Sequence, residues 1–218
     1  MDSVKYNRTF HLPWSKGATN DDKISTNIFK LIGVPIIITE KMDGSNTSLE
    51  KEGCFARTHS GSPSHPSFDG LKSLHASLSW KIPNGIQLFG EWCFAVHSIK
   101  YEKLPNYFLL FNVRDLVTMK WLSWDEVELW AEEIGVFTVP VLFAGIVSSE
   151  KELKEIIELL MIEPSIYGDI REGVVVRVQD SFDDKDFSSN VMKFVRANHV
   201  QTTEHWKNQA IVKNQLSK

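Results

Sequence analysis

Cysteines are scarce in this chain, since Cys54 and Cys93 are the only two among 218 residues. Two cysteines are too few for a disulfide framework, and neither has a partner at metal-ligand spacing, so a reducing compartment fits best. Long apolar runs are missing too, because the longest near-continuous one, residues 33–38, is too short to cross a bilayer. The first residues have no apolar segment behind their charges. We therefore expect a cytoplasmic protein that makes no membrane contact.

An excess of positive charge is missing as well. The 24 Lys and Arg residues stand against 28 Asp and Glu, and the formal net charge of -4 gives no support for tight, unspecific binding of nucleic acid. The acidic residues gather in 125–133, 150–163 and 180–186, and the rest of the chain is neutral to basic. A nucleic acid is an allowed partner, but a local cluster of cations must bind it.

Repeats and linkers rich in Pro, Gly or Ser are also absent, so the sequence indicates one domain over residues 1–218. With 42% hydrophobic and 24% charged residues, the composition is typical of a globular protein. Six segments of strand length are rich in β-branched and aromatic residues and predict strands: 34–39, 46–50, 86–93, 107–113, 137–143 and 173–178.

Helices are predicted between these segments. Ser123 and Glu126 have the spacing of a capping box, and apolar residues recur at helical intervals up to Gly135. A second helix is predicted over 150–162 and a third over 203–216. Because strands and helices do not alternate regularly, we expect an α+β fold with mixed or antiparallel sheets flanked by helices.

The most informative stretch is TEKMDGSN at 39–46. Lys41 stands at the end of an apolar strand and is followed at once by Asp43 and Gly44, which favour a turn. The end of a strand exposes such a lysine to a cleft. On its own, however, the stretch fits a lysine on an ordinary hairpin turn as well.

Four more stretches follow in order, namely FGEW at 89–92, YFLLFNVRD at 107–115, REGVVVR at 171–177 and VMKF at 191–194. With Lys41 they resemble motifs I, III, IIIa, IV and V of the covalent nucleotidyltransferase superfamily of ATP-dependent ligases and RNA-capping enzymes. HLPWS at 11–15 and VRANHVQT at 195–202 make the chain most similar to ATP-dependent RNA ligases of bacteria and phages. The resemblance implies a nucleotidyltransferase fold, the ATP-grasp-like adenylation domain of ligases, without an OB-fold domain.

By this resemblance Lys41 is the catalytic nucleophile that takes AMP from ATP. An amine attacks phosphorus only in its neutral form, whereas the ordinary lysine pKa is about 10.4. We expect burial, neighbouring cations and a bound metal to favour the neutral amine.

The phosphates and the metal are assigned in the same way. Lys193 resembles the catalytic, phosphate-binding lysine of motif V, and Glu172 of motif IV resembles the carboxylate that holds Mg²⁺ or Mn²⁺ directly or through water. Many relatives have two motif V lysines a residue apart, but Val191 and Val195 occupy those places here. Two alternatives follow: Arg196 replaces the second cation, or one lysine suffices.

The resemblance also implies a nucleoside site. Phe111 is similar to the aromatic residue that stacks on adenine, Glu91 to the acid that meets the ribose, and Glu40 to a residue at the adenine edge. Relatives often have Asp where this chain has Asn112, and we assign no role to Asn112.

Arginines are the candidates for contacts with the nucleic acid. Arg57 resembles an arginine that contacts ribose, phosphate or the 5′-phosphate end. Arg177 and Arg196 are weaker candidates for contacts with an RNA backbone. His11 and Trp14 belong to the opening pattern and receive no chemical role.

The function implied is that of an ATP-dependent RNA ligase in RNA repair. Lysyl-AMP would form, AMP would pass to a 5′-phosphate end, and a 3′-hydroxyl would displace it. RNA, including a nicked RNA/DNA duplex, is the expected partner, and a monomer is favoured. The alternatives are a DNA-nick ligase, a GTP-dependent capping enzyme, or a catalytically inert module that binds RNA ends. The last lacks support because the chain retains Lys41, Glu91, Glu172 and Lys193.

Overall fold

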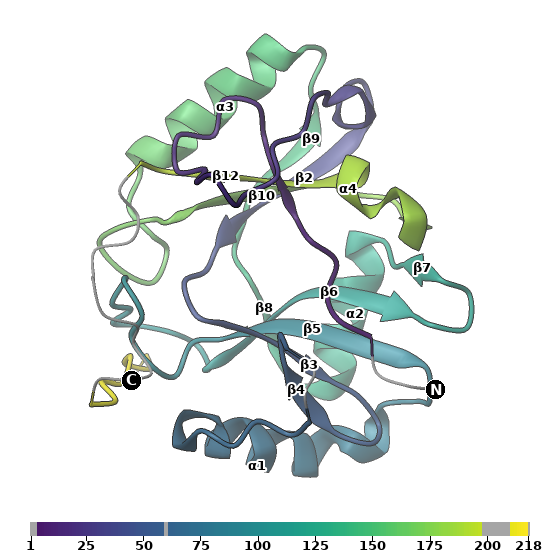
Figure 1. Cartoon of the computed structure of the whole chain (residues 1–218), viewed down its shortest axis with the longest axis vertical. Helices are drawn as coiled ribbons and strands as arrows, with labels where there is room; N and C mark the ends of the chain where they lie inside the picture. The colour runs from purple at the N-terminus through teal and green to yellow at the C-terminus, as the bar shows by residue number, and fades with distance from the viewer. Residues whose placement is uncertain (1–3, 59–60, 198–209, 218) are drawn as a thin grey trace.

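Two β-sheets face each other in the computed structural model, which describes residues 4–58, 61–197 and 210–217 (Figure 1). The first sheet has the strand order β1-β12-β10-β2-β9. Its neighbouring strands are antiparallel except for β1 and β12, which are parallel. The strands are β1 (Phe10–His11), β2 (Pro35–Lys41), β9 (Val141–Ile146), β10 (Gly173–Val178) and β12 (Val191–Val195).

The second sheet has the order β11-β7-β6-β5-β3-β4, and β8 pairs with β6 in parallel. Both sheets are thus largely antiparallel, and the strands do not alternate regularly with helices, which confirms the predicted α+β class. The strands are β3 (Ser45–Leu49), β4 (Cys54–Ala56), β5 (Ile86–Trp92), β6 (Phe108–Asp115), β7 (Lys120–Trp121), β8 (Phe137–Thr138) and β11 (Phe182–Asp183).

Helices lie on the outer sides of the two sheets (Figure 1). The first sheet carries α3 (Glu150–Ile162), and the second carries α1 (Asp69–Leu78) and α2 (Trp124–Ile134), while α4 (Phe187–Asn190) is a short helix before β12. Short 3-10 helices occupy Phe29–Leu31, Pro66–Phe68, Ser79–Lys81 and Asp184–Asp186. In the described part of the chain, no helix is long and apolar enough to span a membrane.

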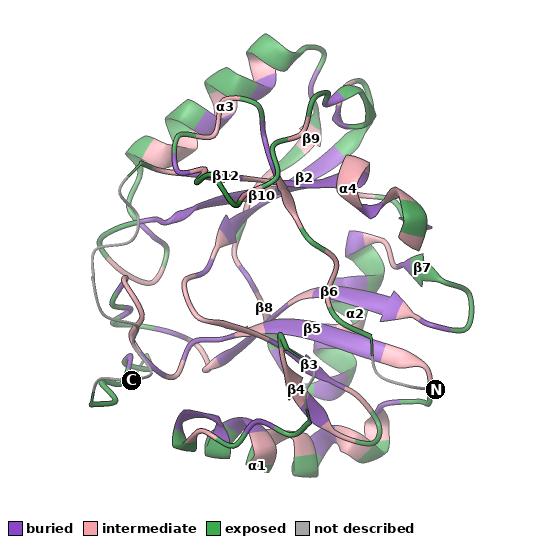
Figure 2. Ribbon diagram, viewed as in Figure 1, coloured by how far each residue is buried: buried purple, intermediate pink, exposed green. Residues whose placement is uncertain are grey.

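Alternation along β2 decides what each face of the first sheet meets. Ile36 and Ile38 are fully buried in one cluster with Leu153 and Ile157 of α3. The residues between them point to the other face, toward the second sheet, because successive side chains of a strand alternate. The strand β2 therefore packs its apolar side against α3 and presents Lys41 toward the second sheet. Most strand residues of both sheets are buried (Figure 2).

Two predicted helices are confirmed. The Ser123 hydroxyl accepts the Glu126 backbone N–H and the Glu126 carboxylate accepts the Ser123 backbone N–H, so the capping box forms at the start of α2. Gly135 ends this helix with φ of 76°, a left-handed conformation that glycine adopts without strain. The helix predicted over 150–162 is α3.

Two other predictions need correction. The single strand predicted over 137–143 is divided at Pro140: β8 joins the second sheet and β9 joins the first. The third helix, predicted over 203–216, lies outside the described residues up to 209, and the described end forms isolated bridges instead, between Ala95 and Lys213 and between Leu104 and Leu216. The sequence interpretation also missed α1.

A β-bulge in the second sheet aims Phe111 toward the first sheet. In the pairing of β5 with β6, Phe89 faces Asn112 and Gly90 faces Leu110, which leaves Phe111 as the extra residue. A bulge of this kind turns a side chain out of the regular alternation. At Gly90 the Phe108 ring occupies the space that a side chain would need.

We therefore expect Gly90→Ala to destabilise the protein. The new Cβ would overlap the Phe108 ring and lie 2.9 Å from the Leu109 carbonyl oxygen. Overpacking of this kind costs about 1–3 kcal/mol of the free energy of unfolding, which urea titration measures. Gly53→Ala is the control, because its Cβ would meet only the edge of the Phe55 ring, at 3.2 Å. Equal losses in the two variants would contradict the interpretation.

Candidate functional site

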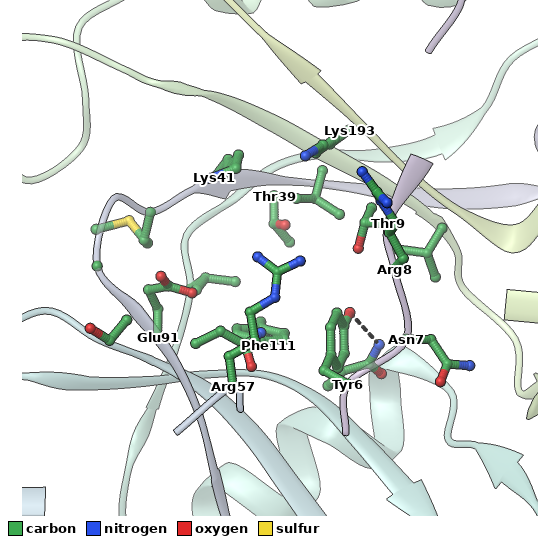
Figure 3. Close-up of a pocket in the computed structure, with 18 of the residues that line it drawn as sticks. Tyr6, Asn7, Arg8, Thr9, Thr39, Lys41, Arg57, Glu91, Phe111 and Lys193 are labelled. Atoms are coloured by element: carbon green, nitrogen blue, oxygen red, sulfur yellow. Dashed lines mark hydrogen bonds between the residues drawn. The ribbon is translucent and has the colours of Figure 1, made fainter. Parts of the chain in front are cut away.

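A cavity of about 490 Å³ opens between the two sheets. Thr39, Lys41 and Lys193 line it from the first sheet, and Glu91 and Phe111 line it from the second (Figure 3). In the register of the first sheet, Lys41 lies opposite Gly173, and Val175 lies between Thr39 and Lys193. Residues from five distant motifs therefore meet at one place.

Lys41 and Glu172 form the closest ion pair of the site. The Lys41 Nζ donates to both carboxylate oxygens of Glu172, each at 2.7 Å. The Lys41 side chain is 26% exposed and that of Glu172 is 7% exposed. Glu172 directly precedes β10, whose first residue, Gly173, pairs with Lys41, and this register brings the two charges together.

The charge state of Lys41 differs from the expectation. Burial lowers the pKa of Lys41, but the carboxylates of Glu172 and Glu91 outweigh burial, so the pKa is raised. The expected neutral amine is therefore wrong for this arrangement, in which Lys41 is an ammonium. Attack on phosphorus requires that the influence of these carboxylates be offset first.

Glu91 responds to the same crowding. The pKa of Glu91 is raised to about 8, mainly by burial and also by the charges of Glu172 and Asp43, while the charge of Lys41 acts in the opposite direction. The Gly44 backbone N–H donates a hydrogen bond to Glu91. Gly44 has no room for a side chain here, because a Cβ would lie 2.8 Å from the Trp92 carbonyl oxygen.

The turn after Lys41 is fixed by backbone donors. The Asp43 carboxylate accepts the N–H groups of Ser98 and Ile99, each at 2.7 Å, and the Asp43 N–H donates to the Tyr101 hydroxyl at 2.8 Å. These bonds connect the turn with the loop between β5 and β6. The side chain of Asn214, near the C-terminal end, in turn accepts the Tyr101 N–H at 2.7 Å.

Phe111 lies in an aromatic group at the side of the second sheet. Its ring packs edge-on against Tyr6, with centroids 5.2 Å apart. Tyr6 also meets Phe89 and Trp121, at 5.0 and 5.3 Å. Asn112, to which the sequence analysis gave no role, donates to the Tyr6 hydroxyl at 3.3 Å. Tyr6, held by Asn112, thus packs beside Phe111 at the cavity.

Arg177 is buried, with 2% of its surface exposed. It donates to the Asn112 carboxamide oxygen at 2.7 Å, to the Leu122 carbonyl at 2.6 Å and to the Val178 carbonyl at 3.0 Å. Burial lowers the pKa of Arg177 to about 10. This geometry argues against the predicted contact of Arg177 with an RNA backbone and gives the side chain an architectural role.

Glu40 points away from the cavity, toward the α3 side. Its Oε2 accepts the Ile166 N–H at 3.0 Å and lies 3.5 Å from Nε of Arg171. The side chain of Glu40 therefore fixes the segment before β10. A contact of Glu40 with adenine would have to come from its backbone, which lines the cavity.

Arg57 and Arg196 lie in different surroundings. Arg57 is exposed after β4, and its guanidinium points into the cavity between Phe111 and Lys41 (Figure 3). Arg196 does not line the cavity; its backbone N–H donates to the Glu172 carbonyl at 3.1 Å. Its Nε and Nη2 are buried and have no hydrogen-bond partner in the described part. The structure brings Arg57, but not Arg196, into the same cavity as Lys193.

The N-terminal segment completes the cavity, and the sequence interpretation missed it. Tyr6, Arg8 and Thr9 line the cavity, with Arg8 and Thr9 on the side of Lys193 and Tyr6 beside Phe111 (Figure 3). No strand or helix pattern marked these residues, and their polar and aromatic types were the only signal. The motif HLPWS at 11–15, which follows shortly after this segment, was the nearest stretch that the sequence interpretation singled out.

The match to a family model decides the classification. The model described as RNA ligase matches residues 34–195, which is well over half of the chain. The chain belongs to the RNA ligase family. A search of curated proteins gives no match.

Solved structures share the fold of this RNA ligase family member. An RNA ligase of Naegleria gruberi with ATP and Mn matches with a TM-score of 0.52 and 15% identity, over 88% of this chain and 60% of its own. An archaeal ATP-dependent RNA ligase matches with a TM-score of 0.53 and 16% identity, over 88% of this chain and 48% of its own. A putative ATP-dependent DNA ligase from Aquifex aeolicus matches with a TM-score of 0.53 and 18% identity, over 88% of this chain and 50% of its own. The chain spans about half to three-fifths of these proteins, so the single-domain organisation stays a prediction.

Glu172 was predicted to hold Mg²⁺ or Mn²⁺, and the side chains around it show whether they can bind such an ion. The described residues hold no group of three His, Cys, Asp or Glu side chains placed to bind a metal. Mg²⁺, however, is commonly held by one or two carboxylates together with substrate phosphates and water. The buried Glu172 carboxylate beside Lys41 fits that kind of site.

We expect Glu91 to make stability depend on pH. Its pKa is about 8 in the folded protein against about 4.5 unfolded, so between these values the folded state holds one more proton and stability falls as pH rises. The free energy of unfolding should fall between pH 5 and pH 8 by ~1–3 kcal/mol less in Glu91→Gln than in the wild type. Urea titrations of both proteins at the two pH values measure this difference, and parallel pH profiles would refute the assignment.

Proposed function

We propose that this protein is an ATP-dependent RNA ligase that passes through a lysyl-AMP intermediate. The observation that carries the proposal is the position of the Lys41 amine, which ends an inner strand at the cavity, touches Glu172, and lies between a cationic side and an aromatic side. Membership of the RNA ligase family and the fold shared with ATP-dependent ligases support it. RNA ends are the proposed substrate.

The first step would transfer AMP to Lys41. A bond forms between the Lys41 nitrogen and the α-phosphorus of ATP, the bond from that phosphorus to the bridging oxygen breaks, and pyrophosphate leaves with the oxygen. The ammonium must lose a proton, and the Glu172 carboxylate at 2.7 Å is in place to accept it. Mg²⁺ or Mn²⁺ held with Glu172 would supply positive charge that lowers the lysine pKa and neutralises the phosphates.

Residues on different sides of the cavity would bind the nucleoside and the phosphates of ATP. Phe111 offers a face for adenine, and Glu91 lies where a ribose hydroxyl can reach a carboxyl group. Lys193 and Arg57 provide positive charge for the phosphates. The later steps would transfer AMP to a 5′-phosphate and join that end to a 3′-hydroxyl with release of AMP.

Lys41→Ala should abolish the covalent adduct, because no other group described in the cavity places an amine at the end of β2. Incubation with labelled ATP and Mg²⁺, followed by denaturing electrophoresis, measures the adduct. Lys120→Ala, at an exposed position of β7, is the control and should label like the wild type. Joining of a pre-adenylylated RNA end should survive in Lys41→Ala, because that substrate bypasses the lysine.

Other outcomes of the same assay would contradict the proposal. Equal labelling by GTP and ATP would indicate a capping-type enzyme. Sealing of nicked DNA in preference to RNA would indicate a DNA ligase. A wild-type protein that binds RNA ends but never forms an adduct would be an inert binding module.

Arg57→Ala should weaken the binding of RNA, since its exposed guanidinium lies at the phosphate side. The loss of one phosphate contact should reduce the slope of log affinity against log salt by about 0.7 on single-stranded RNA. Titration of labelled RNA at several salt concentrations measures this slope. Lys154→Ala, on the outer face of α3, should leave it unchanged. Arg57 would be excluded from the RNA site if both variants kept the wild-type slope.

A further inference from the structure

A chain of polar contacts connects the N-terminal segment with Lys193. His11 of β1 pairs with Lys193 of β12 in a parallel register, so the two side chains lie beside each other. The His11 Nε2 lies 3.3 Å from Oδ1 of Asp22, and the Lys193 Nζ lies 3.4 Å from the same oxygen. One carboxylate oxygen is thus shared by the imidazole and the ammonium.

Asp22 is already well supplied with donors. Its Oδ2 accepts both the N–H and the hydroxyl of Thr19, at 3.1 and 3.0 Å. Partial burial raises the pKa of Asp22, but the Thr19 bonds and the charge of Lys193 outweigh burial and lower the pKa, so the carboxyl is ionised. His11 Nε2 faces Oδ1 of Asp22 at 3.3 Å without the geometry of a full hydrogen bond, and Lys193 reaches the same oxygen only by a long contact of 3.4 Å. The ammonium of Lys41, by comparison, lies 2.7 Å from Glu172.

The tautomer of His11 follows from its other neighbour. The Val195 N–H donates to the Ser15 hydroxyl at 2.9 Å, and that hydroxyl lies 2.8 Å from the His11 Nδ1. The ionised Asp22 carboxylate can only accept, so the proton of the neutral ring lies on Nε2, facing Asp22, and Nδ1 accepts from the Ser15 hydroxyl. Burial and the charge of Lys193 lower the pKa of His11 to about 4, which keeps the ring neutral.

His11 is 1% exposed, its Nε2 makes no full hydrogen bond in the described part of the chain, and Asp22 Oδ1 lies 3.3 Å from it. A buried donor that lost this contact would cost free energy, and Asp22 would lose one of the donors that compete with Lys193. We propose that His11 is a positioning residue, which acts through Asp22 to orient the Lys193 ammonium and leave it free for the phosphates of the nucleotide. This inference relies on the proposed function only for the assignment of Lys193 to phosphate.

Two substitutions separate this role from simple packing. The amide of Asn in His11→Asn replaces Nδ1, next to Ser15, but reaches Asp22 poorly, whereas the amide of Gln in His11→Gln replaces Nε2 and can donate to Asp22. We expect His11→Asn to lower the rate of Lys41 adenylylation at saturating ATP at least tenfold, and His11→Gln to stay within about threefold of the wild type. Equal rates in the two variants, both folded by circular dichroism, would overturn the proposal.

A second background tests the route through Asp22. In Asp22→Asn the carboxylate is gone, so His11→Asn and His11→Gln should then differ less than twofold in the same rate. If the rates of the two His11 variants differed as much with Asn at position 22 as they do with Asp22, His11 would act by another route, and the proposal would be overturned.

The binding of inorganic pyrophosphate, measured by calorimetry, needs no catalysis. Lys193→Ala should weaken it at least tenfold and His11→Asn at least threefold, while His11→Gln should not. If the wild type forms no AMP adduct, the proposed function fails, and this measurement still decides the inference. A wild type that does not bind pyrophosphate, or a His11→Asn protein that binds it with wild-type affinity, would overturn the inference alone.

Discussion

The ion pair between Lys41 and Glu172 is the constraint on which the site depends. It joins the end of β2 to the residue before β10, and it can form only because Gly173 pairs with Lys41 in register. Gly173 also has to be small, since a side chain there would overlap the Phe194 carbonyl of β12. One close approach of three strands thus fixes Lys41, Glu172 and the strand that carries Lys193 relative to one another.

The same ion pair raises the pKa of Lys41, which opposes formation of the neutral amine. Glu172, Glu91 and Asp43 all raise the pKa of Lys41, and two of them raise that of Glu91. This group of acids favours the ammonium form of Lys41, which is not nucleophilic. Nucleotide brings its phosphates with a divalent cation, so the charge that activates the amine would enter with the substrate itself.

The sequence predicted those parts of the site that depend on strand ends and local order. Lys41 stands at the end of a strongly apolar strand, and the helix from Ser123 to Gly135 carries both of its end signals, so local chemistry determines them. The bulge at Phe111, the burial of Arg177 and the division of a strand at Pro140 depend on contacts between distant segments. No local pattern records such contacts, and an arginine at the end of a strand is equally compatible with solvent.

The N-terminal segment shows why these distant contacts matter for function. Tyr6 supports Phe111 on the second sheet, and His11, five residues later, lies beside Lys193 on the first. A single short stretch therefore touches the proposed base side and the proposed phosphate side of the cavity. Because its residues pack against both sheets, a shift of one sheet relative to the other would disturb Phe111 and Lys193 together. The spacing between Phe111 and Lys193 is thus set by this segment as well as by the sheets.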